Sequence, residues 1–205
     1  MYRFLVRTLL LICLVFAAGA LSVVHADSPT EGRAGRAEVR FLEGMIDHHQ
    51  MALDMANDCL AKATSDAVKT LCQNIITAQT AEIETMQGWL LAWYAVAYQP
   101  ISMMSMTDTS MMEMDHSGMG MPNSDPVMMM GMMAGLARLQ GGDYEIAWLE
   151  SMIDHHDDAL HMATRILRQT EGSGHPELRA LAEAILTDQT AEIALMEGLI
   201  SDLAK

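Results

Sequence analysis

The residues best suited to chemistry are two copies of the sequence Met-Ile-Asp-His-His, at positions 45–49 and 152–156. Each copy lies in a long segment whose apolar residues recur at helical spacing, which places the histidines at a buried helix face. A buried imidazole costs free energy unless a hydrogen-bond partner or a metal ion satisfies it. Two such pairs in one chain make a metal site the leading hypothesis.

Methionines accompany the histidines at helical spacing on both segments. The predicted bundle site comprises His48, His49, Met45, Met51 and Met55, together with His155, His156, Met152 and Met162. Imidazole nitrogen and thioether sulfur are soft ligands, suited to Cu(I) or Ag(I) and poorly suited to Mg²⁺ or Ca²⁺. The alternative is a polar seam in which Gln79 and Gln189 satisfy neutral histidines while methionine fills the core.

Two carboxylates, Glu82 and Glu192, lie in matching copies of Gln-Thr-Ala-Glu-Ile. They would either orient the histidines through hydrogen bonds or bind metal directly, as in carboxylate–histidine di-iron sites. Such a site normally uses Glu-x-x-His on two helices, but Glu43 precedes His48 by five residues. The di-iron signal is therefore weak, and a partly solvated surface carboxylate is a third interpretation.

A second methionine-rich region lies between the two histidine motifs. Residues 103–133 contain thirteen methionines, although a solvated linker has no packing reason to hold them and exposed methionine is prone to oxidation. Within it, Met114, His116, Met119 and Met121 place thioethers around one imidazole. We expect a copper-capture segment at 103–121. For Met128 to Met133, packing over the bundle is an equal alternative.

Four long helices are expected to position these groups. Their approximate ranges are 34–61, 66–97, 144–170 and 176–203. Ser65 and Asp143 are the predicted N-caps, Pro176 a first helical residue, and Pro100 the end of the second helix. The predicted buried seam of the second helix is Val68, Leu71, Ile75, Gln79, Ile83, Met86, Leu90 and Trp93.

The first two helices repeat as the last two. Residues 41–56 and 148–163 share eleven of sixteen positions. Two αα-hairpins with one apolar stripe each bury those stripes best against one another. The fold prediction is therefore an all-α four-helix bundle of ferritin-like type. Its parts are the first hairpin at 34–98, a Met-rich linker at 99–135 and the second hairpin at 136–205.

The turn positions also predict the register within each hairpin. Folding back near Thr64 sets His49 level with Gln79, and folding back near Gly172 sets His156 level with Gln189. Each histidine pair should therefore lie beside a glutamine and within a turn of a glutamate. Across the two hairpins, His49 and His156 are expected to approach each other near the pseudo-two-fold axis.

The N-terminus is typical of an export signal at 1–26. Arg3 and Arg7 precede an apolar run that ends in Val-His-Ala, although an uncleaved anchor is the alternative. A periplasmic or secreted protein would then keep Cys59 and Cys72, which favours a disulfide over a thiolate metal site. The net charge of −15 argues against nucleic acid as a partner.

The duplicated Met-Ile-Asp-His-His, the following Ala-Leu-x-Met-Ala and the repeated Gln-Thr-Ala-Glu-Ile resemble the domain of unknown function 305 family over residues 40–203. The resemblance implies an exported, ferritin-like four-helix protein. Because some family members are periplasmic copper-binding proteins, it also implies copper resistance as the setting. The long Met-rich linker and Asp158, at the position matching Met51, depart from the family pattern.

These observations predict an exported Cu(I) or Ag(I) buffer or chaperone in copper tolerance rather than an enzyme. Its expected partners are the metal ion and a copper-handling protein. The first alternative is a ferritin-like metal-dependent oxidase using Glu82, Glu192 and the histidines. The second is a structural module in which the histidines satisfy one another without metal.

Overall fold

The structure, a computed structural model, describes residues 28–100 and 126–205, without the side chains of 126–129. The helices are α1 (Gly32–Lys62), α2 (Asp66–Tyr94), α4 (Pro126–Leu136), α5 (Gly141–Gln169) and α6 (Pro176–Leu203). The expected export signal and the predicted site at Met114, His116, Met119 and Met121 lie outside the described residues. No helix in the described ranges is long and apolar enough to span a membrane.

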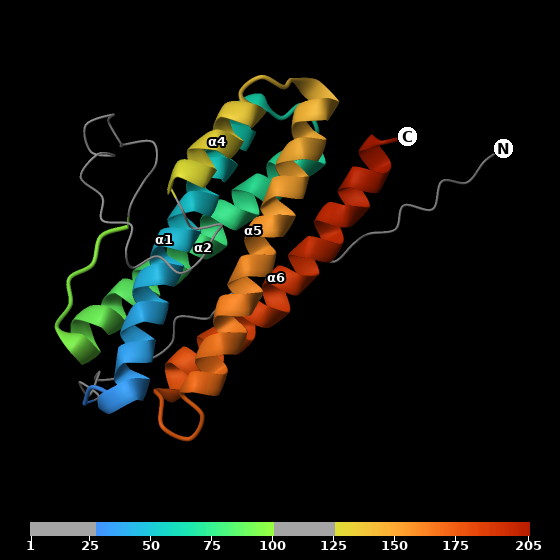
Figure 1. The fold of residues 1–205 in the computed structure, drawn as a ribbon. Helices are drawn as coiled ribbons and strands as arrows, with labels where there is room; N and C mark the ends of the chain where they lie inside the picture. The colour runs from blue at the N-terminus through green and yellow to red at the C-terminus, as the bar shows by residue number, and fades with distance from the viewer. Residues whose placement is uncertain (1–27, 101–125) are drawn as a thin grey trace.

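The helices form two antiparallel hairpins that pack against each other. Helix α1 pairs with α2 and α5 pairs with α6, while α1 and α5 join the hairpins by running antiparallel to each other (Figure 1). This arrangement confirms the predicted all-α bundle built from repeated αα-hairpins. The helices that carry the two histidine motifs are therefore the two that meet at the interface between hairpins.

The core is divided into two apolar clusters along the α1–α5 pair. One contains Met55, Cys59, Trp148 and Met152, and the other contains Leu42, Met45, Met162 and Ile166. The indole Nε1 of Trp148 donates a hydrogen bond to the carbonyl oxygen of Met55 at 2.9 Å, which fixes the register between α5 and α1. The histidines of both motifs lie in sequence between residues of the two clusters, so they occupy the middle of the bundle.

Two predicted helix boundaries are confirmed and two are wrong. Ser65 caps α2 through its side chain, and α6 begins at Pro176. Asp143 lies in the first turn of α5, after the N-cap residue Gln140, where a carboxylate still favours the helix dipole. Helix α2 ends at Tyr94 rather than at the predicted Ala97, because Ala95 adopts a left-handed conformation with φ of 55°.

Helix α4 overlaps the end of the segment at 99–135 that was predicted to be a linker. It begins at Pro126 and ends at Leu136, whose side chain is buried against the cluster that contains Trp148. Met132 and Met133 are partly buried against the same cluster. For these two methionines, packing over the bundle is the interpretation that the structure supports.

A carboxylate from each hairpin holds the turn of the other hairpin. Glu145 of α5 accepts hydrogen bonds from the backbone N–H groups of Thr64 and Ser65 at 2.5 and 2.7 Å. Glu38 of α1 accepts from the backbone N–H of His175 at 2.8 Å, and Ser65 and His175 are the N-cap residues of α2 and α6. These buried contacts lock the hairpins together in a pseudo-two-fold arrangement.

The predicted disulfide is confirmed. Cys59 near the end of α1 is bonded to Cys72 in the second turn of α2, with their Cα atoms 6.4 Å apart. The bridge crosses the turn of the first hairpin only, since Ile166 and Ala182 occupy the matching positions of the second.

Replacing both cysteines, Cys59→Ser with Cys72→Ser, is expected to lower the free energy of unfolding by about 2–3 kcal/mol, because the oxidised chain loses less loop entropy on folding. Urea denaturation of the oxidised wild type and of the variant measures the difference. Wild-type protein under reducing conditions is the matched control, and it should lose a similar amount. Equal stability of all three would contradict a stabilising role for the bridge.

Candidate metal centre

The two histidine motifs meet where α1 and α5 cross. The rings of His48 and His155 are tilted by 35°, with their centroids 3.7 Å apart. His48 is completely buried, and His155 is 4% exposed. Two imidazoles from different hairpins are thus held against each other in the core.

Three of the four histidines hydrogen-bond through Nε2 to an oxygen. His155 is 2.9 Å from the carbonyl oxygen of His48. His49 is 2.5 Å from Glu82 Oε2, and His156 is 2.7 Å from Glu192 Oε2. A carbonyl and an ionised carboxylate can only accept, so in each case Nε2 carries the proton.

In the neutral ring, a proton on Nε2 leaves a lone pair on Nδ1 of His49, His155 and His156. All three Nδ1 atoms are buried and have no hydrogen-bond partner among the described residues, and neither ring nitrogen of His48 has one. Buried polar atoms without partners are uncommon in folded proteins. Four imidazoles with unpartnered nitrogens therefore lie in the middle of the bundle.

The pKa values of His48 and His155 are held well below their ordinary value of 6.5. Burial is the main cause, and repulsion from the neighbouring histidines adds to it. Both rings are consequently neutral at neutral pH, and a neutral imidazole is the form that binds metal.

The ring contact between the hairpins differs from the predicted one. His48 and His155 meet, whereas His49 and His156 point toward the second helix of their own hairpin. Neighbouring residues on a helix project about 100° apart. Only one histidine of each pair can therefore face the other hairpin, and the sequence alone did not identify which one.

Glu82 and Glu192 orient two of the histidines through hydrogen bonds, which is the first of their predicted roles. Each carboxylate is partly exposed, with side-chain exposures of 22% and 26%, and each fixes the tautomer of a completely buried histidine. Gln79 and Gln189 are buried as predicted, at 3% and 4% exposure. Because both Gln79 amide atoms and Gln189 Oε1 lack partners in the described residues, the structure does not support glutamines that satisfy the histidines.

The predicted methionines of the bundle site are buried on both sides of the histidines. Met45 and Met162 lie in one apolar cluster, and Met51, Met55 and Met152 lie in the other. Met86 and Met196, which the sequence analysis did not name as site residues, are also completely buried in these two clusters. Their matching positions three residues after the repeated Gln-Thr-Ala-Glu-Ile were the available signal.

This donor set fits a soft ion of low coordination number. Within residues 28–100 and 126–205, no three imidazole, carboxylate or thiolate groups converge in a way that would hold a metal ion. The free donors are imidazole nitrogens, with thioethers in the adjoining apolar clusters. Cu(I) and Ag(I) accept such ligands readily, while harder ions require more oxygen donors.

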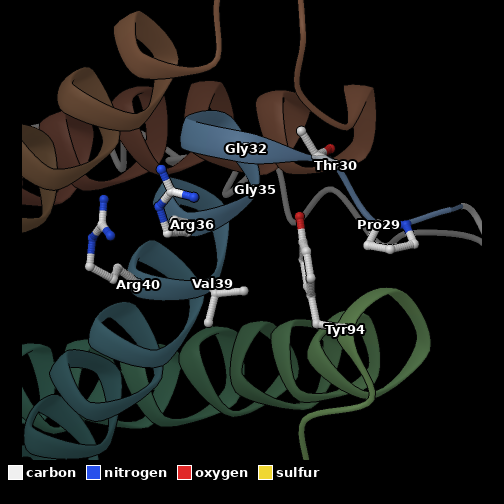
Figure 2. A pocket seen from close by; sticks show the side chains of 8 residues that line it. All are labelled: Pro29, Thr30, Gly32, Gly35, Arg36, Val39, Arg40 and Tyr94. Carbon is white, nitrogen blue, oxygen red and sulfur yellow. The ribbon is translucent and has the colours of Figure 1, made fainter.

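A surface pocket at the beginning of α1 is separate from this centre. Its volume is about 390 Å³, and Arg36 and Arg40 line one side while Tyr94 lines another (Figure 2). A helix rises about 1.5 Å per residue, so Arg36 lies roughly 18 Å from His48 along α1. Guanidinium groups repel cations, which makes this pocket unsuitable for a metal ion.

Comparison with known proteins relates this chain to one protein family. The sequence model of the family described as domain of unknown function (DUF305) matches residues 38–200. No curated protein sequence matches this chain. A solved DUF305 fragment from Deinococcus radiodurans is 29% identical and has a TM-score of 0.60, with 81% of this chain and 96% of that chain covered.

Structures of CopM in metal-bound forms are also similar. The Cu(II)-bound form is 32% identical, with a TM-score of 0.59, and covers 80% of this chain and 96% of CopM. The Cu(I)-bound form and the Ag-bound form obtained by co-crystallization are both 28% identical, with the same TM-score and coverage.

Proposed function

This chain belongs to the DUF305 family, and from that premise we propose that it is an exported Cu(I)- and Ag(I)-binding protein that acts as a metal buffer or chaperone. The observation that carries the proposal is the group of buried, unpartnered imidazole nitrogens on His48, His49, His155 and His156. Such atoms are a liability in an apolar core unless they receive a ligand. The similarity to copper- and silver-bound CopM supports the same class of cargo.

In this proposal the imidazole nitrogens and the flanking thioethers hold the ion. Glu82 and Glu192 keep Nε2 of His49 and His156 protonated, so that Nδ1 remains the donor atom. The metal is cargo, and no catalytic step is assigned to any residue. Copper tolerance is the proposed role, and a copper-handling protein is the proposed partner.

The Met-rich segment is the second proposed binding region. Residues 103–121 would hold Cu(I) through thioethers and His116, which are ligands that a soft ion of low coordination number accepts. Export is proposed from the sequence pattern at 1–26, and a similar solved structure carries the name "putative secreted protein DUF305 from Streptomyces coelicolor".

Metal analysis of the protein purified from its native compartment is the direct test of this function. The proposal expects copper in the purified protein, together with saturable Cu(I) binding in vitro. An iron content with oxygen consumption on addition of Fe(II) would instead support the oxidase alternative. No bound copper and no binding at micromolar Cu(I) would support a structural module.

Substituting the orienting carboxylates, Glu82→Leu with Glu192→Leu, is expected to weaken Cu(I) affinity at the bundle about 10- to 100-fold, because the histidines lose the acceptors that fix their tautomer. Glu82→Gln with Glu192→Gln is the matched variant, since an amide oxygen still accepts from Nε2, and it should recover most of the affinity. Competition with a chromophoric chelator measures both. If both pairs of variants bound as tightly as the wild type, the carboxylates would have no orienting role.

A further inference from the structure

The surface pocket at the beginning of α1 is formed where three parts of the chain meet. Its lining comes from the segment before α1, the first turns of α1 and the end of α2. Its volume of about 390 Å³ is within the size range of small-molecule sites. Figure 2 shows Arg36 and Arg40 on one side of the pocket and Pro29 and Tyr94 on the other. The pocket is therefore built by tertiary contacts rather than by one helix.

Two walls of the pocket are anchored on a buried pair, Glu38 and His175. The Tyr94 hydroxyl donates a hydrogen bond to Glu38 Oε2, and Thr30 Oγ1 lies 3.1 Å from His175 Nδ1. His175 Nδ1 is in turn 2.6 Å from Glu38 Oε2, and Glu38 is completely buried. The backbone of Thr30 also packs so closely on Gly35 that a Cβ atom there would lie 1.7 Å from the Thr30 carbonyl oxygen. These contacts fix Thr30 and Tyr94 relative to α1, so the pocket is preformed.

The charge at the pocket is positive in a chain that is strongly acidic overall. The chain has 27 acidic and 12 basic residues. Arg36 and Arg40 are exposed, and their i and i+4 spacing places both on one helix face, where like charges repel. Within the part of the chain that the structure describes, no carboxylate forms an ion pair with either arginine. Two guanidinium groups are thus available to an anion at the pocket.

The rest of the lining is largely apolar. Val39 and Pro29 contribute aliphatic surface, and Tyr94 contributes an aromatic ring whose hydroxyl is already hydrogen-bonded to Glu38. A guanidinium group binds a carboxylate through two parallel hydrogen bonds. An apolar lining disfavours a strongly hydrated ion such as inorganic phosphate, because that ion would lose water without gaining enough hydrogen-bond partners. The complementary ligand therefore combines one carboxylate with an apolar body.

We propose that this pocket binds an organic carboxylate whose apolar or aromatic body contacts Val39 and Tyr94 while its carboxylate pairs with Arg36 and Arg40. The carboxylate belongs either to a free small acid or to the C-terminal residue of a peptide, since both present the same group. The site is separate from the histidine centre and does not depend on the proposed metal-binding function.

Nitrogen-15 NMR titration of the full chain, in a buffer free of carboxylates, tests the proposal with hydrocinnamate and N-acetylphenylalanine as probes. Saturable binding is expected with a Kd of about 0.1–10 mM, because both probes are small. Arg36→Gln with Arg40→Gln should weaken it by about ten-fold or more, since the carboxylate loses its charged donors. Arg138→Gln with Arg168→Gln is the matched control. It removes the same charge from exposed arginines outside the pocket and should bind as the wild type does.

A neutral probe and the comparison of the two acids complete the test. N-acetylphenylalaninamide keeps the ring but lacks the charge, and it should bind about ten-fold more weakly or worse. Tighter binding of N-acetylphenylalanine than of hydrocinnamate would identify the ligand as a peptide C-terminus, and equal or weaker binding would identify it as a free acid. The proposal would be overturned if neither acid bound saturably, if the amide bound equally well, or if the loss of Arg36 and Arg40 had no effect. None of these results would affect the proposed metal-binding function.

Discussion

Replacing His48 and His155 together with leucine is expected to abolish Cu(I) and Ag(I) binding at the bundle while the helices remain intact. These two rings form the contact between the hairpins and supply three of the unpartnered nitrogens. Leucine is apolar and close to imidazole in size, so it removes the buried polar atoms without leaving a large cavity. The metal-free variant should therefore be at least as stable as the wild type at neutral pH.

The difference in stability should grow on acidification. The pKa values of His48 and His155 in the folded protein lie well below 6.5, so the unfolded chain takes up protons first as the pH falls. The contribution of these two histidines to the free energy of unfolding is fully present above about pH 6.5. It decreases as the pH falls toward their folded-state pKa values, by up to about 1.4 kcal/mol per pH unit for each histidine. The free energy of unfolding of the leucine variant does not decrease in this way, because leucine does not titrate.

Urea denaturation of the metal-free proteins at several pH values, with circular dichroism as the readout, measures both effects. His161→Leu is the control, because His161 is exposed on α5, and it should retain the wild-type pH dependence and metal binding. A double variant that unfolds more readily than the wild type at acidic pH would contradict the assignment of these rings as buried and neutral.

Deletion of residues 103–125 is expected to remove the fraction of Cu(I) binding that survives acid. This segment contains eight methionines and one histidine, and thioethers do not titrate. The bundle site depends on imidazoles, which lose metal when they become protonated. Burial lowers the pKa values of His48 and His155, so this loss occurs well below pH 6.5. The intact protein should therefore retain part of its copper at low pH, whereas the deleted protein should retain almost none.

Competition of Cu(I) against a chromophoric chelator, at pH values of about 7 and about 4.5, distinguishes the two regions. Substitution of His116 alone, His116→Ala, is the control, and it should leave most of the acid-resistant binding in place. If the deletion variant kept that binding, the Met-rich segment would be only a connection between hairpins.

The sequence predicted the parts of the fold that depend on local periodicity. All eight predicted seam residues of α2, from Val68 to Trp93, are buried because helical spacing fixes which positions share a face. The bounds of α6 agree because Pro176 favours a first helical turn, and the disulfide agrees because Cys59 and Cys72 flank one tight turn. Repetition of these local patterns was sufficient to predict two paired hairpins.

Contacts between segments distant in the sequence could not be predicted in the same way. The cross-hairpin contacts of Glu38 and Glu145 join residues separated by 137 and by 80 or 81 positions. The pairing of His48 with His155 depends on the rotation of α1 against α5, which periodicity leaves undetermined to within about one residue. Helix α2 ends where Ala95 adopts a left-handed conformation. Alanine rarely adopts this conformation, so the sequence did not predict it.

Nitrogen-15 NMR of histidine-labelled protein tests directly whether the unpartnered imidazole nitrogens in the core hold the metal. Spectra are recorded before and after addition of one equivalent of silver nitrate, with assignments from single histidine variants. We expect the Nδ1 resonances of His49 and His156 to shift as these atoms bind Ag(I), while their Nε2 atoms stay protonated and hydrogen-bonded to Glu82 and Glu192. Unchanged resonances for all four core histidines in the silver-loaded protein would contradict it.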